Sequence, residues 1–295
     1  MIANEIFLRT FGSLTDEQWR DVLLLSCDHP VIQSVEFPPL PDEKLQSGYV
    51  GSSGVEAFKE AFVFYQEVRK YARSLGIRLD LNAKVLDFGV GWGRFYRVFL
   101  RHLATENFIG IDVDQDCIDL CRASIPYGRF EKCDVAPPFD LIKDKSLDIV
   151  YAYSVFSHLN EATSQLWVRE FARVLKPGGM LIVTTLKKAH IGVWQNLMET
   201  GWEGWRQALE QAGFSVPKAE SDFDNGMFLY CAIGGGGVLS RDFYGEAIIS
   251  PAYVRKAWVP VLDFVDYVAE DTRGPQAVIV MRKPSAAMPS LQKEI

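Results

Sequence analysis

Several features that assign a chain to a common class of protein are missing from these 295 residues. No apolar run reaches the ~20 residues that a membrane-spanning helix needs, so we expect no membrane span. An excess of basic residues is also missing, because the formal net charge is −7, and this argues against a nucleic-acid partner. The apolar stretch VLLLSC at 22–27 follows an acidic segment rather than a basic one, so we expect no signal peptide.

Cysteine is scarce, and its pattern excludes a disulfide framework. The five cysteines are odd in number and no secretory signal is expected, so a reduced, cytoplasmic setting fits them best. Cys117 and Cys121 lie four residues apart in a helical pattern, which would place them on one helix face. No His or Cys pair with ligand spacing completes a site around them, so we expect ordinary helix packing and no metal.

The most informative feature that is present is the run VLDFGVGWGRF at 85–95. A short apolar segment leads into Gly89, Gly91 and Gly93, and a helical pattern, RFYRVFLRHL, follows them. A strand, a glycine turn and a helix start let the backbone come close to a cofactor. A dinucleotide fingerprint would place a third glycine at 94, where this chain has Arg94. The spacing therefore favours S-adenosylmethionine (SAM) over NAD.

Acidic residues follow the next two strands of the pattern. The segment FIGID ends in Asp112, which lies ~20 residues beyond the first glycine, where such folds bind ribose hydroxyls. Asp134 stands in KCDVAPPF, after a short amphipathic helix. The segment SLDIVYAYSVFSHL predicts a further strand, and RVLKPGGMLIVTT predicts a helix end, a Pro-Gly-Gly turn and another strand. Ligands of open α/β sheets bind at the carboxyl ends of strands, so we expect the site there.

Taken together, these segments of residues 84–185 resemble the class I SAM-dependent methyltransferases. The resemblance implies an α/β, Rossmann-like fold, with a mostly parallel seven-stranded sheet whose last strand is antiparallel. It also implies SAM as cofactor, with the glycine loop under its methionine and ribose portions and one acidic residue each for the ribose, the adenine and the methionine amino end. The cofactor-binding residues that it implies are Asp87, Gly89, Gly91, Gly93, Asp112, Val113, Asp134, Val135 and Tyr153.

The remaining segments are expected to surround this core. Residues 1–80 predict a helical cap, with helices at 15–26 and 55–75 and an extended loop over 36–54. Residues 81–284 then form the methyltransferase domain, in which 189–258 is a substrate-side insertion or lid. Four consecutive glycines at 234–237 indicate either a mobile loop near the ligand or a plain linker. The tail, 285–295, is expected to be disordered.

His158 is the candidate general base. It stands in YSVFSHL just past a predicted strand, and an ordinary histidine pKa of ~6.5 suits proton removal from an alcohol. A helix-capping or packing histidine is the alternative interpretation. The residues expected to frame the acceptor are Tyr49, Trp92, Phe156, Asp242 and Tyr244.

The leading hypothesis is methyl transfer to a hydroxyl group of a small molecule or glycan. The block DFYGEAIISPAYV at 242–254 and QAVIVMRK at 276–283 loosely resembles a subgroup found with sugar-modifying enzymes. Three alternatives stay open: N-methylation of a metabolite or amino sugar, a non-catalytic SAM-binding protein, and a nicotinamide-dependent dehydrogenase. The last is opposed by the missing third glycine. The sequence does not indicate an oligomeric state.

Overall fold

The computed structural model describes residues 4–235 and 237–285, so the predicted disorder of the tail falls almost entirely outside the described residues. The helices are α1 (Glu5–Phe11), α2 (Asp16–Leu25), α3 (Glu43–Val50), α4 (Gly54–Ser74), α5 (Arg94–Phe99), α6 (Gln115–Ser124), α7 (Glu161–Val174), α8 (His190–Thr200), α9 (Glu203–Gln211), α10 (Val216–Asp224) and α11 (Pro251–Ala257). The strands are β1 (Val31–Ile32), β2 (Val35–Glu36), β3 (Val85–Phe88), β4 (Phe108–Asp112), β5 (Arg129–Lys132), β6 (Leu147–Ala152), β7 (Leu175–Thr185), β8 (Leu229–Cys231), β9 (Glu246–Ile248), β10 (Asp263–Val268) and β11 (Ala277–Arg282). None of the helices within these ranges is long and apolar enough to cross a membrane.

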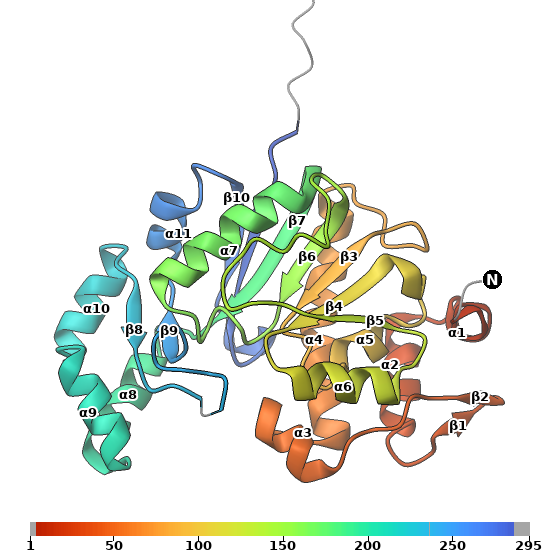
Figure 1. The fold of residues 1–295 in the computed structure, drawn as a ribbon, viewed down its shortest axis with the longest axis horizontal. Coiled ribbons are helices and arrows are strands. Elements are labelled where there is room, and N and C mark those ends of the chain that lie inside the picture. Colours follow the sequence, from red (N-terminus) through yellow and green to blue (C-terminus); the bar gives the residue numbers. More distant parts are fainter. Residues whose placement is uncertain (1–3, 236, 286–295) are drawn as a thin grey trace, which may run out of the picture.

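A seven-stranded sheet in the order β10-β11-β7-β6-β3-β4-β5 forms the centre of the molecule (Figure 1). The five neighbouring strands β5, β4, β3, β6 and β7 pair in parallel, whereas β11 is antiparallel to both β7 and β10. The predicted Rossmann-like fold with an antiparallel last strand is therefore confirmed. The chain enters the sheet at β3 and fills first one side and then the other, so the strand order reverses between β3 and β6.

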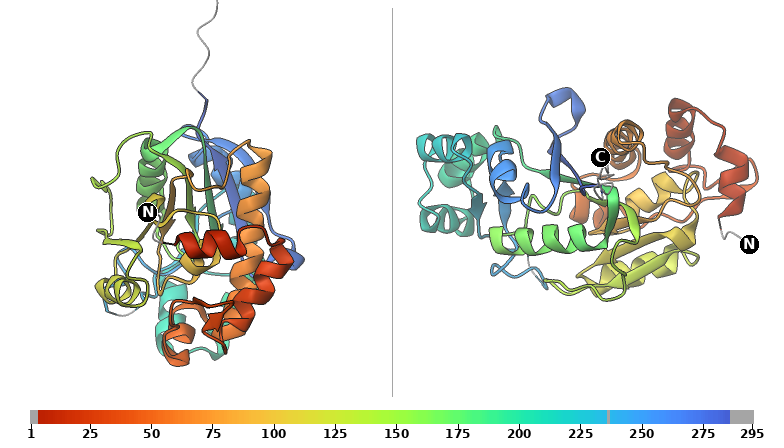
Figure 2. Two further views of the ribbon diagram at one scale, coloured as in Figure 1. Left: turned by 90° about the vertical axis from the view of Figure 1, so that its right-hand side faces the viewer. Right: turned by 90° about the horizontal axis from the view of Figure 1, so that it is seen from above.

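Helices cover both faces of this sheet, and each face has its own buried core (Figure 2). On one face the long helix α4 packs with α5 and α6, and its amphipathic pattern places Phe58, Phe64 and Tyr65 inward. On the other face α7 and α11 bury Trp167, Phe171 and Trp258. Both cores reach the carboxyl ends of the strands, so these ends are held rigidly from two sides.

A third core lies apart from these two, at the end of the molecule away from the N-terminal helices (Figure 2). It joins α8, α9 and α10 to the small antiparallel pair β8 and β9. The chain then returns to the central sheet, where β10 and β11 form an antiparallel pair at its edge. This third unit reaches the edge of the sheet through residues 239–245, which return towards the central strands.

Two sequence expectations need correction. The segment 36–54 is not only an extended loop, because it contains α3, whose first turn is capped by the Asp42 side chain and whose end is Gly51 at φ +76°. The Pro-Gly-Gly segment is not a turn between a helix and a strand, because residues 175–185 all belong to β7. Leu147 pairs with Leu175 but Ile149 pairs with Met180, so the intervening residues of β7 bulge out, with Gly178 at φ +82°.

The helix predicted at 15–26 is confirmed as α2, and its start offers a test of local stability. The Thr15 side chain accepts a hydrogen bond from the Gln18 backbone, and the Gln18 side chain accepts one from the Thr15 backbone. Loss of such a cap costs about 1 kcal/mol. We expect the Thr15→Ala variant to lower the unfolding midpoint by roughly 2–4 °C, measured by calorimetry. An unchanged midpoint would show that tertiary packing alone fixes this helix end.

Candidate functional site

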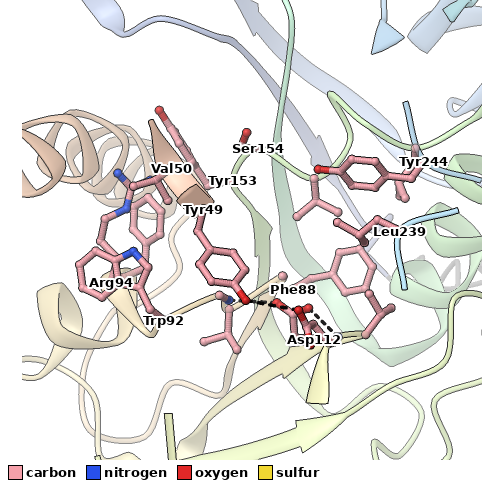
Figure 3. Close-up of a pocket in the computed structure, with 18 of the residues that line it drawn as sticks. Tyr49, Val50, Phe88, Trp92, Arg94, Asp112, Tyr153, Ser154, Leu239 and Tyr244 are labelled. Carbon is pink, nitrogen blue, oxygen red and sulfur yellow. Dashed lines mark hydrogen bonds between the residues drawn. The ribbon is translucent and has the colours of Figure 1, made fainter. Parts of the chain in front are cut away.

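A cavity of about 160 Å³ opens at the carboxyl edge of the sheet, where the strand order reverses (Figure 3). A single water needs only ~10–15 Å³ of such space, so the cavity has room for an organic ligand. Its walls come from residues 88–92, 112–114 and 153–155, which follow β3, β4 and β6, together with Val135 after β5. Figure 3 shows Trp92 and Arg94 on one side of the cavity, Leu239 and Tyr244 on the other, and Asp112 at the base.

Each of the three glycines of the loop is required for a different structural reason. Gly89 has φ +80°, and a Cβ there would lie 2.3 Å from Val155 Cγ2, so the chain passes too close for any other residue. Gly91 has φ +51°, and a Cβ there would meet no protein atom within 4 Å, so its open side faces the cavity. Gly93 lies outside the cavity lining and begins α5, at φ +78°.

Asp112 is the acidic group that faces the cavity. Its Oδ2 accepts a hydrogen bond from the Gly91 backbone at 3.0 Å, and its Oδ1 accepts one from the Asp114 backbone at 3.0 Å. An ionised carboxylate accepts about four hydrogen bonds, so acceptor capacity remains for two ligand hydroxyls. Burial raises the pKa of Asp112. Val113 lines the cavity beside it, and the Tyr49 hydroxyl donates to Asp114 at 3.3 Å from the tip of α3.

Asp87 lies on β3 beneath the glycine loop rather than in the cavity wall. Its side chain is buried, and its Oδ2 has no hydrogen-bond partner. Burial raises the pKa of this carboxyl group to about 7. A buried carboxylate without a partner is costly unless a ligand supplies one, which is a common sign of a functional group.

Arg94 is a cavity residue that the sequence reasoning did not identify as functional. The side chain is 4% exposed, Nη1 donates to Ala57 O at 3.1 Å, and Nε has no hydrogen-bond partner. Glu60 Oε1 lies 3.6 Å from Nη1 and accepts a 2.6 Å hydrogen bond from the Tyr153 hydroxyl. The position of Arg94 directly after Gly93, in place of a third glycine, was the signal in the sequence.

His158 lies close to the cavity but does not line it, whereas Ser154 and Tyr244 do. Its Nδ1 lies 2.9 Å from Gly245 O, its Nε2 lies 3.5 Å from Ser154 Oγ, and its ring stacks on Tyr244 with centroids 4.8 Å apart. Burial lowers the pKa of the imidazole, so it is neutral at neutral pH.

Besides Asp87, Gly93 and His158, three further predicted site residues lie outside the cavity lining, namely Asp134, Asp242 and Phe156. Asp134 is exposed and outside the cavity lining, although Val135 beside it is a lining residue. Asp242 is also exposed and accepts a hydrogen bond from Ser240 Oγ. Phe156 is fully buried in the core of the opposite face, because Val155 before it points towards the glycine loop. Trp92 lies in the wall, and its indole Nε1 has no hydrogen-bond partner.

Over residues 4–235 and 237–285, no group of three or more His, Cys, Asp and Glu side chains could hold a metal ion. Cys117 and Cys121 are buried on α6, and Cys121 Sγ lies 3.1 Å from Gly91 O. Both thiols are packed in the interior, as the helical spacing predicted, and Cys121 lies against the glycine loop.

Comparison with known proteins agrees with this geometry. A family described as a methyltransferase domain matches residues 85–179. The trans-aconitate 2-methyltransferase of Variovorax paradoxus is 30% identical over 122 residues, which are 40% of this chain and 46% of that protein. This chain therefore spans about half the length of that curated relative.

Solved structures resemble this chain at low sequence identity. A protein from Listeria monocytogenes, provisionally assigned as a SAM-dependent methyltransferase, is 14% identical with a TM-score of 0.50, covering 74% of this chain and 100% of its own. A SAM-dependent methyltransferase from Mesorhizobium loti is 13% identical with a TM-score of 0.47, over 72% of this chain and 96% of its own.

Proposed function

We propose that this chain, whose residues 85–179 match a family described as a methyltransferase domain, methylates an oxygen atom of a small molecule. SAM is the cofactor of the class I SAM-dependent methyltransferases, which the sequence resembles. The observation that carries the proposal is the cavity at the reversal of the strand order, where Gly91 leaves its open side to a ligand and Asp112 is oriented by two backbone groups.

The cavity residues match the parts of SAM in chemistry. Asp112 has free acceptor capacity for the two ribose hydroxyls, and Val113 and Val135 offer apolar surface for the adenine. Asp87 beneath the glycine loop and Arg94 in the cavity wall each have a buried polar atom without a partner, which suits the ammonium and carboxylate groups of the methionine end. Ionised groups form the strongest hydrogen bonds, so this end contributes much of the expected affinity.

When bound, SAM supplies an electrophilic methyl group on a sulfonium. The protein's contribution is to hold an acceptor oxygen in line with that group and to exclude water. Leu159, Leu239 and Phe243 give the acceptor side an apolar wall, and Ser154 and Tyr244 place two hydroxyl groups in it. An apolar wall with only these two hydroxyl groups suits a small acceptor with one reacting hydroxyl.

The nature of the acceptor is the finer part of the proposal. The curated relative is a trans-aconitate methyltransferase, and trans-aconitate is a small molecule. The matched family and the relatives named above do not point to a sugar or glycan, and Asp242, expected to grip a polyhydroxy acceptor, is exposed outside the cavity. We therefore propose a small-molecule acceptor without further specification.

Calorimetric titration tests the cofactor site. We expect SAM and its demethylated product, S-adenosylhomocysteine, to bind, and NAD not to bind. Methylthioadenosine, which lacks the amino acid end, should bind much more weakly because it gives Asp87 and Arg94 no charged partner. Asp112→Ala should weaken SAM binding roughly 5- to 150-fold, the equivalent of about 1–3 kcal/mol for lost hydrogen bonds to a charged group.

A screen of small hydroxy compounds with isotopically labelled methyl-SAM then tests the transfer, read by mass spectrometry. Labelled methyl on an acceptor oxygen supports the proposal. Binding of SAM without transfer to any acceptor would favour a non-catalytic SAM-binding protein, and transfer to amines alone would favour N-methylation.

A further inference from the structure

Ser154 occupies an unusual position in the cavity wall. It follows β6 by two residues and has φ +58°, a left-handed conformation that residues other than glycine rarely adopt. Its backbone N–H donates to Thr184 Oγ1 at 2.7 Å, and this bond holds the turn in place. Strained residues of this kind concentrate at functional sites, and here the strain brings a hydroxyl group to the cavity surface.

A closed ring of hydrogen bonds orients that hydroxyl. Because Thr184 Oγ1 already accepts the Ser154 N–H, its own proton is donated to Gln276 Oε1 at 2.6 Å. The amide of Gln276 therefore turns its Nε2 to Ser154 Oγ, to which it donates at 2.9 Å. With one acceptor site occupied in this way, the Ser154 proton is free to point to His158 Nε2, which lies 3.5 Å away.

The tautomer of His158 follows from its other contact. Gly245 O lies 2.9 Å from Nδ1, and a carbonyl oxygen only accepts hydrogen bonds, so the proton of the neutral ring is on Nδ1. The lone pair of Nε2 consequently faces Ser154 Oγ. The ring is fixed in this orientation by Tyr244, which stacks on it at 8° between planes.

We propose that Ser154 relays a proton from the acceptor hydroxyl to His158, and that Thr184 and Gln276 position Ser154 for this transfer. The inference rests on the proposed O-methylation. As the acceptor oxygen bonds to the methyl carbon, the carbon–sulfur bond breaks and its electron pair stays on sulfur. The acceptor proton passes to Ser154 Oγ while the Ser154 proton passes to His158 Nε2, which becomes an imidazolium and later releases that proton to solvent. His158 thus serves the cavity without lining it.

The surroundings of His158 suit a terminal base. Burial and His190 on α8 disfavour the charged form of the His158 imidazole, whereas Glu246 on β9 favours it. Tyr244, which stacks on the ring, is neutral. Burial is the largest influence and lowers the pKa of the imidazole. The ring is therefore unprotonated and ready to accept a proton at neutral pH.

Single-turnover kinetics at saturating SAM test the relay. Ser154→Gly removes the hydroxyl and relieves the left-handed strain, so the variant should fold, with a melting temperature within a few degrees of wild type. We expect it and His158→Gln each to slow methyl transfer by about 10²-fold, at the lower end of general-base effects, with unchanged affinity for SAM. The double variant should be no slower than either single variant, because both substitutions interrupt the same proton transfer.

The pH profile and a matched control complete the kinetic test. Wild type should slow at acid pH as His158 becomes protonated, and this limb should vanish in both variants. Ser157→Ala, in the same loop with a buried hydroxyl that has no hydrogen-bond partner, should keep the wild-type rate and profile. Additive losses in the double variant, or an acid limb that persists in Ser154→Gly, would overturn the relay.

Nuclear magnetic resonance of the ligand-free protein gives a readout that does not depend on methyl transfer. In ¹⁵N spectra of the imidazoles, His158 should carry its proton on Nδ1, and Ser154→Gly should shift its titration midpoint whereas Ser157→Ala should not. A proton on Nε2, or identical midpoints in Ser154→Gly and wild type, would refute the contact. If no acceptor is methylated but these shifts are observed, the proposed function fails while the Ser154–His158 contact stands.

Discussion

The Gly91→Val variant is expected to lose measurable affinity for SAM while keeping its fold. A Cβ at position 91 would meet no protein atom within 4 Å, so the added side chain clashes with nothing in the protein and fills the cavity instead. A valine there would occupy the space where a ligand lies against the loop backbone, and we expect a loss of more than about 100-fold, the equivalent of ~2.7 kcal/mol. Calorimetric titration measures it, and circular dichroism checks the fold.

The backbone at position 91 also has φ +51°, which is unfavourable for valine, so strain must be separated from cavity filling. Gly213 provides the matched control. It has φ +61°, a Cβ there would likewise meet nothing within 4 Å, and it lies after α9, outside the cavity lining. Gly213→Val should lose a similar amount of stability and bind SAM normally. Normal SAM binding by Gly91→Val would mean that the glycine loop is not the cofactor cradle.

The Asp87→Asn variant is expected to be more stable than wild type at pH 8 and yet to bind SAM poorly. Burial raises the pKa of Asp87 to about 7, well above the ordinary aspartate value of about 3.9. A carboxyl group whose pKa is higher in the folded than in the unfolded state stabilises the fold only while it is protonated. Its contribution is present below pH ~4 and lost as the pH rises to ~7.

The size of this effect follows from the shift. One pKa unit corresponds to about 1.4 kcal/mol, so a rise of roughly three units makes the ionised carboxylate cost wild type on the order of 4 kcal/mol at pH 8. Asparagine removes the charge at nearly the same volume. We therefore expect the stability gain of Asp87→Asn to be small near pH 4 and full above pH 7, measured by urea unfolding at several pH values.

Asp148→Asn is the control for a carboxylate on the same sheet. Asp148 lies at the other end of the strands and binds Lys176 Nζ at 2.7 Å, so its loss should slightly destabilise the protein. A constant difference between Asp87→Asn and wild type across this pH range would show that folding does not raise the pKa of Asp87. Full SAM affinity in Asp87→Asn would remove this carboxylate from the site.

Local sequence patterns indicated those site residues that lie within a few positions of a strand end. The glycine loop and Asp112 each belong to a strand and the turn that follows it, so their spacing alone indicates where they lie. Tyr153 was expected from the resemblance to the methyltransferases and Tyr244 from its polar and aromatic stretch, and both line the cavity. Phe156 was expected to shape the cavity, but its side chain is buried in the core while its neighbour Val155 lines the cavity.

The parts that were missed depend on residues far apart in the sequence. Gln276 meets Ser154 across 122 positions, and Glu60 meets Tyr153 across 93, so no spacing rule connects either pair. Arg94 was noticed only as a missing glycine, because its function depends on a helix that arrives from the N-terminal segment. Long-range polar contacts of this kind depend on tertiary packing, and the local pattern of a single sequence does not reveal that packing.

Two arginines of α5 and a third in the turn that follows it link the glycine loop to the N-terminal residues. Beyond Arg94, which reaches Ala57 O, Arg97 donates to Pro39 O at 2.7 Å and Arg101 donates to Leu14 O at 2.6 Å and pairs with Asp16. All three guanidinium groups are buried, so detachment of the N-terminal segment would leave each of them short of partners. Because α5 directly follows the glycine loop, a ligand that orders this loop should also stabilise the hydrogen bonds between these arginines and residues 14–57. We therefore expect bound cofactor to slow the proteolytic cleavage of residues 14–57, including those that lie far from the cavity.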